Sequence, residues 1–167
     1  LCTAGLCFKL VHGIIKFLRE AKHKTAFEIR PKDFLPLAAI GTLADMVPLR
    51  GENRILAKYG LKHLRNNPEV GLRSLLKLAN LDTRFPFDSE DITFRIAPRI
   101  NACGRLDRPE IAAELLLTKN SEEASKLARI TNEFNEERKL IETKLTEQAL
   151  DQAETKFASR KAAVITG

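Results

Sequence analysis

The chain contains no Trp, one Tyr, one Met and only three Cys among its 167 residues. Gly and Pro are not enriched, and 44% of the residues are apolar, which excludes a collagen-like chain, a disulfide scaffold and a wholly disordered chain. No apolar run approaches the roughly 18 residues that a membrane span needs. The first residues also lack the basic leader and cleavage site of a signal peptide. The sequence therefore predicts a globular chain with one substantial core and no membrane segment.

The three cysteines, Cys2, Cys7 and Cys103, cannot all pair within one chain, and no CxxC motif is present. We therefore expect free thiols in a reducing cytoplasm. The chain starts at Leu1 and its one Met is Met46, from which we expect a piece of a longer protein.

The net charge of +6 is unevenly distributed. Residues 1–119 carry 20 Lys and Arg against 13 Asp and Glu, whereas residues 120–160 carry 7 against 9. A basic first part suggests an acidic partner such as nucleic acid, although many basic proteins bind nothing acidic.

Helical periodicity dominates the first half of the chain. Residues 25–29 favour a short strand, and Asp33 is predicted to cap an apolar, buried helix that ends before Pro48. Further helices are predicted over 52–66 and 70–79. The first helix of the chain is predicted from four apolar residues three or four apart: Leu6, Leu10, Ile14 and Phe17.

The second half is predicted to be irregular over 80–109 and helical thereafter. Asp107 is predicted to cap a short helix, and Asn120 to cap a much longer one over 121–159, which contains no Gly or Pro. At 1.5 Å per residue, about 39 residues span nearly 60 Å, which indicates a helix that connects two domains. Residues 162–166 are typical of the first strand of a following domain.

Asp45 is the clearest single candidate for a catalytic or metal-binding residue. It follows a buried helix, where the negative end of the helix dipole and burial both disfavour a carboxylate unless a cation or hydrogen-bond donors compensate. A metal ion is one such cation. A salt bridge with Arg50, or a cap for the next helix, would also satisfy the carboxylate.

The second candidate is an arginine cluster within residues 95–108. Arginine forks match phosphate oxygens in pairs, and a nearby Gly lets backbone N–H groups approach closely, so Arg99, Asn101 and Arg105 predict a phosphate-binding loop. The alternative is a solvated turn in which the arginines pair with four acidic residues: Asp88, Glu90, Asp91 and Asp107.

A third candidate is a basic stripe formed by Arg50, Arg54, Lys58 and Lys62, which are each four residues apart. Residues at this spacing share one helix face. The stripe is either an exposed polar surface or a rail for a phosphate backbone.

Two of these segments resemble a known family. Residues 41–54, GTLADMVPLRGENR, resemble the GTxADxxPLxGENR segment of RecJ-type exonucleases, and residues 98–105, PRINACGR, resemble their PRxNAxGR segment. The order and separation of the two segments also fit, and so does a long helix after them. The resemblance covers essentially the whole chain and places it in the DHH phosphoesterase family.

The resemblance implies a 5′→3′ single-strand DNA exonuclease of DNA repair and recombination, with Mn²⁺ or Mg²⁺ at a two-metal site. Of the family's metal ligands only the last Asp has a match here, Asp45, because the chain contains no Asp-His-His and no Asp-x-Asp sequence. Two-metal hydrolysis needs several ligands, so we expect this piece alone to be inactive. The resemblance also favours phosphate contacts by Arg99, Asn101 and Arg105, and it leaves Arg54 and Lys58 open as further contacts.

The expected architecture is mostly α in this piece of an α/β parent. Residues 1–119 are expected to end the DHH catalytic domain, 120–160 to form the connecting helix, and 161–167 to begin the DHH-associated domain. Two alternatives remain: a DHH-family phosphodiesterase acting on oligonucleotides or a cyclic dinucleotide, and a non-catalytic nucleic-acid-binding homologue.

Overall fold

The computed structural model describes residues 1–81 and 87–157, and within them it contains helices and no strand. This confirms the mostly α architecture. The elements are α1 (Thr3–Glu20), η1 (Lys24–Phe27), η2 (Pro31–Phe34), α2 (Leu35–Ala44), α3 (Gly51–Asn66), α4 (Val70–Leu78), α5 (Ser89–Asp91), the π-helix η3 (Ile92–Ile96), α6 (Ala97–Arg105), α7 (Pro109–Leu117) and α8 (Ser121–Phe157).

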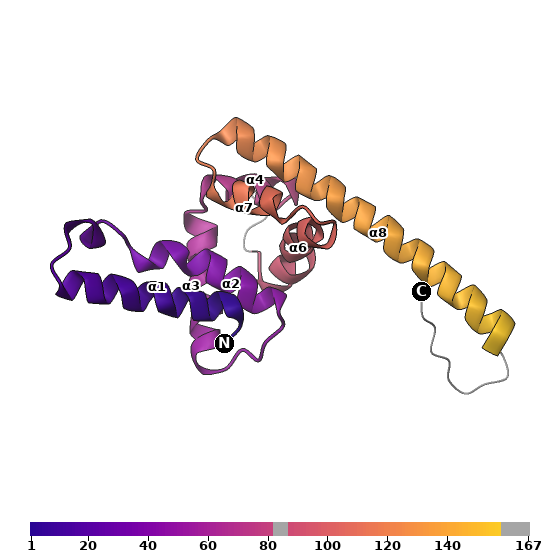
Figure 1. The fold of residues 1–167 in the computed structure, drawn as a ribbon, viewed down its shortest axis with the longest axis horizontal. Helices are drawn as coiled ribbons and strands as arrows, with labels where there is room; N and C mark the ends of the chain where they lie inside the picture. The colour runs from indigo at the N-terminus through magenta and orange to yellow at the C-terminus, as the bar shows by residue number, and fades with distance from the viewer. Residues whose placement is uncertain (82–86, 158–167) are drawn as a thin grey trace.

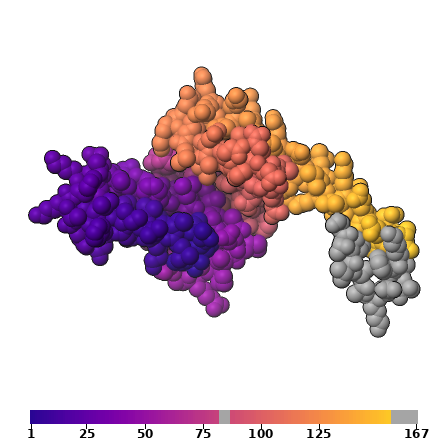
Figure 2. Space-filling model, viewed as in Figure 1, coloured from indigo at the N-terminus to yellow at the C-terminus, as the bar shows by residue number. Residues whose placement is uncertain are grey.

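The helices form two adjoining groups with α8 along one side (Figure 1). In the first group α2 packs between α1 and α3, and in the second α4, α6 and α7 pack against α8. The C-terminal half of α8 extends away from the body (Figure 2). None of the helices described is both long enough and apolar enough to cross a membrane.

The long helix agrees with its prediction and spans 37 residues, about 55 Å. The Asn120 side chain accepts hydrogen bonds from the backbone N–H groups of Glu122 (2.8 Å) and Glu123 (3.1 Å), which is the predicted N-cap. Beyond the body of the protein its apolar side chains Leu145 and Leu150 are exposed. The predicted end at 158–159 and the proposed strand at 162–166 lie outside the described residues.

One core joins the two groups of helices. It takes apolar side chains from α2, α3, α4, η3, α6, α7 and the first part of α8. The η3–α6 segment lies at its centre, with Ile92, Ile96, Ala102 and Cys103 almost completely buried. The second recognisable motif is therefore built into the core.

Two glycines allow helices to approach closely. A Cβ added to Gly60 in α3 would overlap the carbonyl oxygen of Leu35 and the Cβ of Ala39 in α2. Likewise, a Cβ on Gly71 in α4 would overlap the carbonyl oxygen of Leu115 in α7. Because backbone atoms cannot move aside as a flexible side chain can, these contacts require the absence of a side chain.

Two predictions for the first half are wrong. Residues 25–29 form no strand, because the 3-10 turn η1 occupies Lys24–Phe27 and Arg19 donates to the carbonyl of Ala26 (2.9 Å). Asp33 does not cap α2, whose N-terminal flanking residue is Phe34. Its carboxylate instead accepts from Arg30 at 2.9 Å.

The first helix exists as predicted, but its apolar stripe does not face the described core. Gly5 and Ile15 are the buried residues of α1. The helix meets α2 through Ala4, which approaches Gly41. The four residues of the predicted stripe are exposed: Leu6, Leu10, Ile14 and Phe17.

The prediction of an irregular segment over 80–109 is wrong from Ser89 onwards, where α5, η3 and α6 follow one another directly. Asp107 also does not cap α7, which is preceded by Arg108. It adopts a left-handed conformation with φ of 57°, and Arg108 N–H donates to the carbonyl of Cys103 at 2.8 Å. This pattern closes the C-terminus of α6, so Asp107 ends one helix rather than beginning the next.

The Gly60→Ala change is expected to destabilise the chain by about 1–3 kcal/mol, because the new methyl group must push α2 away from α3. Urea unfolding of this chain measures the effect. Gly13→Ala is the matched control: a Cβ there meets no atom within 4 Å, so its helix should gain up to about 1 kcal/mol. Equal unfolding midpoints for Gly60→Ala and the unmodified chain would contradict the close contact.

Candidate functional site

Asp45 lies at the C-terminus of α2, where its backbone N–H donates to the carbonyl of Gly41 at 3.0 Å. Its carboxylate is exposed, and no hydrogen bond or ion pair to it is found among the residues described. The two compensating contacts considered from the sequence are absent there: no ion pair joins it to Arg50, and α3 has no side-chain cap. The carboxylate is therefore presented to solvent, available to an external cation.

The chain turns sharply after Asp45. Met46 has a positive φ of 50°, and its N–H donates to the carbonyl of Leu43 at 3.1 Å. The hydroxyl of Thr93 in η3 lies 3.4 Å from that same carbonyl and donates to the Ser89 carbonyl at 2.9 Å. The end of α2 is thereby held against the segment that leads into the second motif.

A shallow groove of about 250 Å³ lies between these two segments. The Met46 side chain is 73% exposed beside it and that of Phe94 68% exposed. No sequence pattern indicates this groove, because its two walls are about 50 residues apart and meet only through α2 and η3. Its lining is Thr42, Leu43, Met46, Val47, Leu49, Ser89, Glu90, Thr93 and Phe94.

The second motif is a helix, α6, and the prediction of a loop is wrong. Pro98 lies in the first turn of α6, directly after the π-helix η3. Ala102 and Cys103 face the core, whereas Asn101 and Arg105, four residues apart, are exposed on one face. No partner of the Arg105 guanidinium is found in the described parts of the chain, so its donors face solvent.

Arg99 leaves α6 on a different face, toward α8. Its Nε donates to the side-chain oxygen of Asn132 at 3.0 Å, and its Nη1 donates to the carbonyl of Arg95. Partial burial of the guanidinium lowers the pKa of Arg99, while the nearby Glu136 carboxylate acts to raise it. The structure therefore separates Arg99 from Asn101 and Arg105, which the sequence had grouped.

One of the pairings considered in the solvated-turn alternative is present, but it lies in a helical segment and not in a turn. Arg95 pairs with the buried Asp91 at 3.2 Å, whereas Arg108 pairs with Glu110 at 2.5 Å rather than with the acidic residues considered. Two arginines of this segment, Arg95 and Arg108, thus form ion pairs. The other two, Arg99 and Arg105, are partly or fully exposed.

The basic stripe lies on α3 as its spacing predicts. Arg54, Lys58 and Lys62 are exposed, and Arg50 directly precedes the helix. Lys58 places its ammonium 5.8 Å from the centre of the Tyr59 ring. Among the described residues, 1–81 and 87–157, no ion pair neutralises these four cations. The stripe is therefore a positively charged surface.

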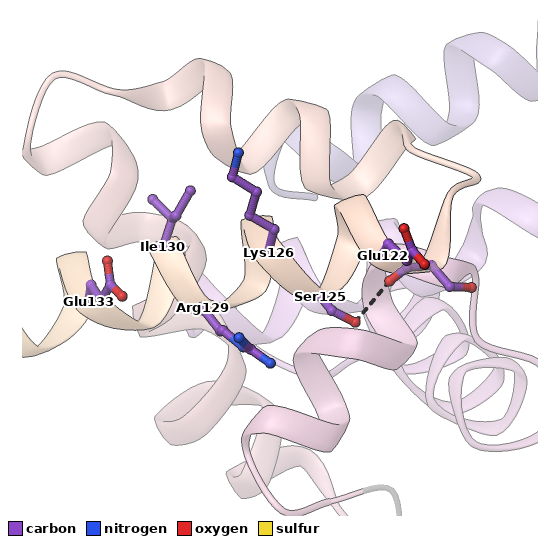
Figure 3. A pocket seen from close by; sticks show the side chains of 7 residues that line it. Glu122, Ser125, Lys126, Arg129, Ile130 and Glu133 are labelled. Carbon is purple, nitrogen blue, oxygen red and sulfur yellow. Dashed lines mark hydrogen bonds between the residues drawn. The ribbon is translucent and has the colours of Figure 1, made fainter.

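Another hollow lies on the first part of α8 (Figure 3), but it lacks the features of a site. All its lining residues come from one helix. The charged ones are of both signs and include Lys126, Arg129 and Glu133. Its Ser125 hydroxyl is occupied by a hydrogen bond to the Ser121 carbonyl at 2.8 Å.

A metal site cannot be completed from the residues that the structure describes. No group of three or more His, Cys, Asp or Glu side chains suited to a metal is found among them. Cys2, Cys7 and Cys103 are free thiols, and two of them are buried. Asp45 fits a hard divalent cation as an exposed oxygen ligand, but it supplies one ligand only.

The chain is homologous to single-stranded-DNA-specific exonucleases. It is 36% identical to RecJ of Bacillus subtilis over 99% of its own length and 35% identical to RecJ of Escherichia coli over 96%. It spans 19% and 28% of those two proteins, respectively. No protein-family model matches the chain.

Solved structures agree with this relationship. The crystal structure of RecJ from Thermus thermophilus in complex with Mn²⁺ matches with a TM-score of 0.69 and 37% identity, over 77% of this chain and 19% of that one. The Mg²⁺ complex of the same protein matches with a TM-score of 0.69 and 38% identity, over 76% of this chain and 20% of that one. The resemblance predicted from the two motifs is thus confirmed.

Proposed function

We propose that this chain is a segment of a RecJ-like exonuclease that hydrolyses single-stranded DNA in the 5′→3′ direction, and that Asp45 is one of its metal ligands. The observation that carries the proposal is the exposed Asp45 carboxylate at the C-terminus of α2, for which no hydrogen bond or ion pair is found among the residues described. Homology to RecJ at 35–39% identity supports it.

Asp45 would hold Mn²⁺ or Mg²⁺, for which carboxylate oxygens are the preferred ligands. In a two-metal site the bound ions supply an activated water and stabilise the leaving oxygen. The remaining ligands must come from other parts of the complete protein, so we expect the present chain alone to bind Mn²⁺ weakly and to cleave no DNA. We further place the complete protein in the cytoplasm, in DNA repair and recombination.

The cationic residues would position the DNA strand. Arg99, Asn101 and Arg105 on α6 would contact phosphate at or near the reacting end. Arg54 and Lys58 on α3 would follow the backbone of the same strand. The exposure of Arg105, Arg54 and Lys58, without an ion-pair partner in the described residues, supports these roles.

Asp45→Asn in the complete protein should lower the rate of digestion of labelled single-stranded DNA by orders of magnitude, because the neutral amide is a far weaker metal ligand. The fold should be unchanged, since the side chain is exposed. Asp151→Asn, an exposed carboxylate on the distal part of α8, is the matched control and should digest normally. Near-normal turnover by Asp45→Asn would disprove the ligand assignment. Binding without digestion by the unmodified protein would favour a non-catalytic homologue.

Arg105→Ala in the complete protein should weaken binding to single-stranded DNA and reduce the slope of log affinity against log salt by up to about 0.7. Arg105→Lys should restore the affinity only in part, because an ammonium cannot form the paired fork. Fluorescence anisotropy across a salt series measures both effects, and Lys144→Ala on the distal part of α8 serves as the control. An unchanged slope together with unchanged turnover would show that Arg105 is only a solvated side chain.

A further inference from the structure

The face of α8 that meets the rest of the protein changes character along its length. Ala124, Leu127 and Ala128 pack in the apolar core. One turn later the buried positions are polar: Thr131 is 0% exposed and Asn135 is 1% exposed. The Thr131 hydroxyl donates back to the carbonyl of Ala128 within α8, at 2.7 Å, so a bond from this section to α6 must come from a neighbouring residue.

Asn132 lies in this section and contacts Arg99 directly. Its side-chain oxygen accepts the hydrogen bond from Arg99 Nε at 3.0 Å, across 33 residues of sequence. Nη1 of the same guanidinium donates to the carbonyl of Arg95 in η3, one turn before Arg99. The two acceptors come from different elements, α8 and η3, and together they hold the plane of the guanidinium.

The Arg99 guanidinium, although held in place, retains N–H donors for a ligand. A guanidinium carries five N–H groups, of which Nε and one on Nη1 are engaged here. No acceptor for Nη2 is found among residues 1–81 and 87–157. The two N–H groups of Nη2 and the remaining one of Nη1 are left to donate to the oxygens of a phosphate.

We propose that Asn132 is a positioning residue for Arg99: it holds the guanidinium in the orientation that binds the DNA phosphate, and so ties the phosphate contact to the long helix. This rests on the proposed phosphate-binding role of Arg99. The physical reason is preorganisation. Without the acceptor, the arginine regains rotamer freedom that must be lost again when DNA binds.

Removing this preorganisation should weaken DNA binding and leave the rate of the hydrolysis step nearly unchanged. Asn132→Ala in the complete protein should raise KM for single-stranded oligodeoxythymidine about three- to tenfold, with kcat nearly unchanged. The metal-free affinity for the same oligonucleotide should fall by a similar factor. Asn132→Asp keeps an oxygen acceptor and should restore both values. Gln148→Ala, an exposed amide on the distal part of α8, should change neither value.

A double-mutant cycle separates positioning from a general structural role. In an Arg99→Ala background, Asn132→Ala should have no further effect on affinity, because no guanidinium remains to be positioned. The same loss in both backgrounds would overturn the proposal, as would unchanged affinity in Asn132→Ala. If the unmodified protein binds the oligonucleotide but does not digest it, the exonuclease function fails, while the affinity cycle still decides the role of Asn132. Unchanged affinity in Arg99→Ala would overturn both the phosphate role of Arg99 and this inference.

Discussion

The burial of η3 and α6 between α2 and α8 is the constraint on which the rest of the structure depends. Ile92, Ile96, Ala102 and Cys103 anchor this segment in the core. With the buried side fixed, each remaining face of α6 has a defined direction. One presents Asn101 and Arg105 to solvent, and another directs Arg99 to α8.

The same packing brings the two recognisable motifs together. The Thr93 hydroxyl lies against the last turn of α2 at the Leu43 carbonyl, two residues before Asp45. The last turn of α2, which directly precedes the exposed Asp45, is thereby held against η3, and η3 leads directly into α6.

Helix positions were largely predictable from the sequence, because apolar spacing and capping are local signals. α4 and α8 were predicted within a few residues, and Asn120 caps α8 as expected. Asp107 was misassigned because an Asp in a left-handed turn that closes one helix resembles an N-cap of the next. The arginine-rich segment was taken for a loop because its charges and its Gly and Pro hide a helix whose small apolar residues are buried.

Which residues meet across the fold was not predictable. The stripe on α1 correctly indicated a helix, but periodicity does not say what covers a face, and in the described structure the stripe is exposed. The contact of Arg99 with Asn132 joins positions 33 residues apart, without any pattern linking them. By contrast, the shared face of Arg54 and Lys58 on α3 was predictable from their four-residue spacing, and both residues are exposed.

Diffraction can show whether Asp45 is a metal ligand, as we propose. Crystals of the complete protein grown with Mn²⁺, with data collected at the manganese absorption edge, would locate the ions by their anomalous signal. A manganese peak is expected about 2 Å from a carboxylate oxygen of Asp45. Manganese bound elsewhere, with the Asp45 carboxylate still facing solvent, would contradict it.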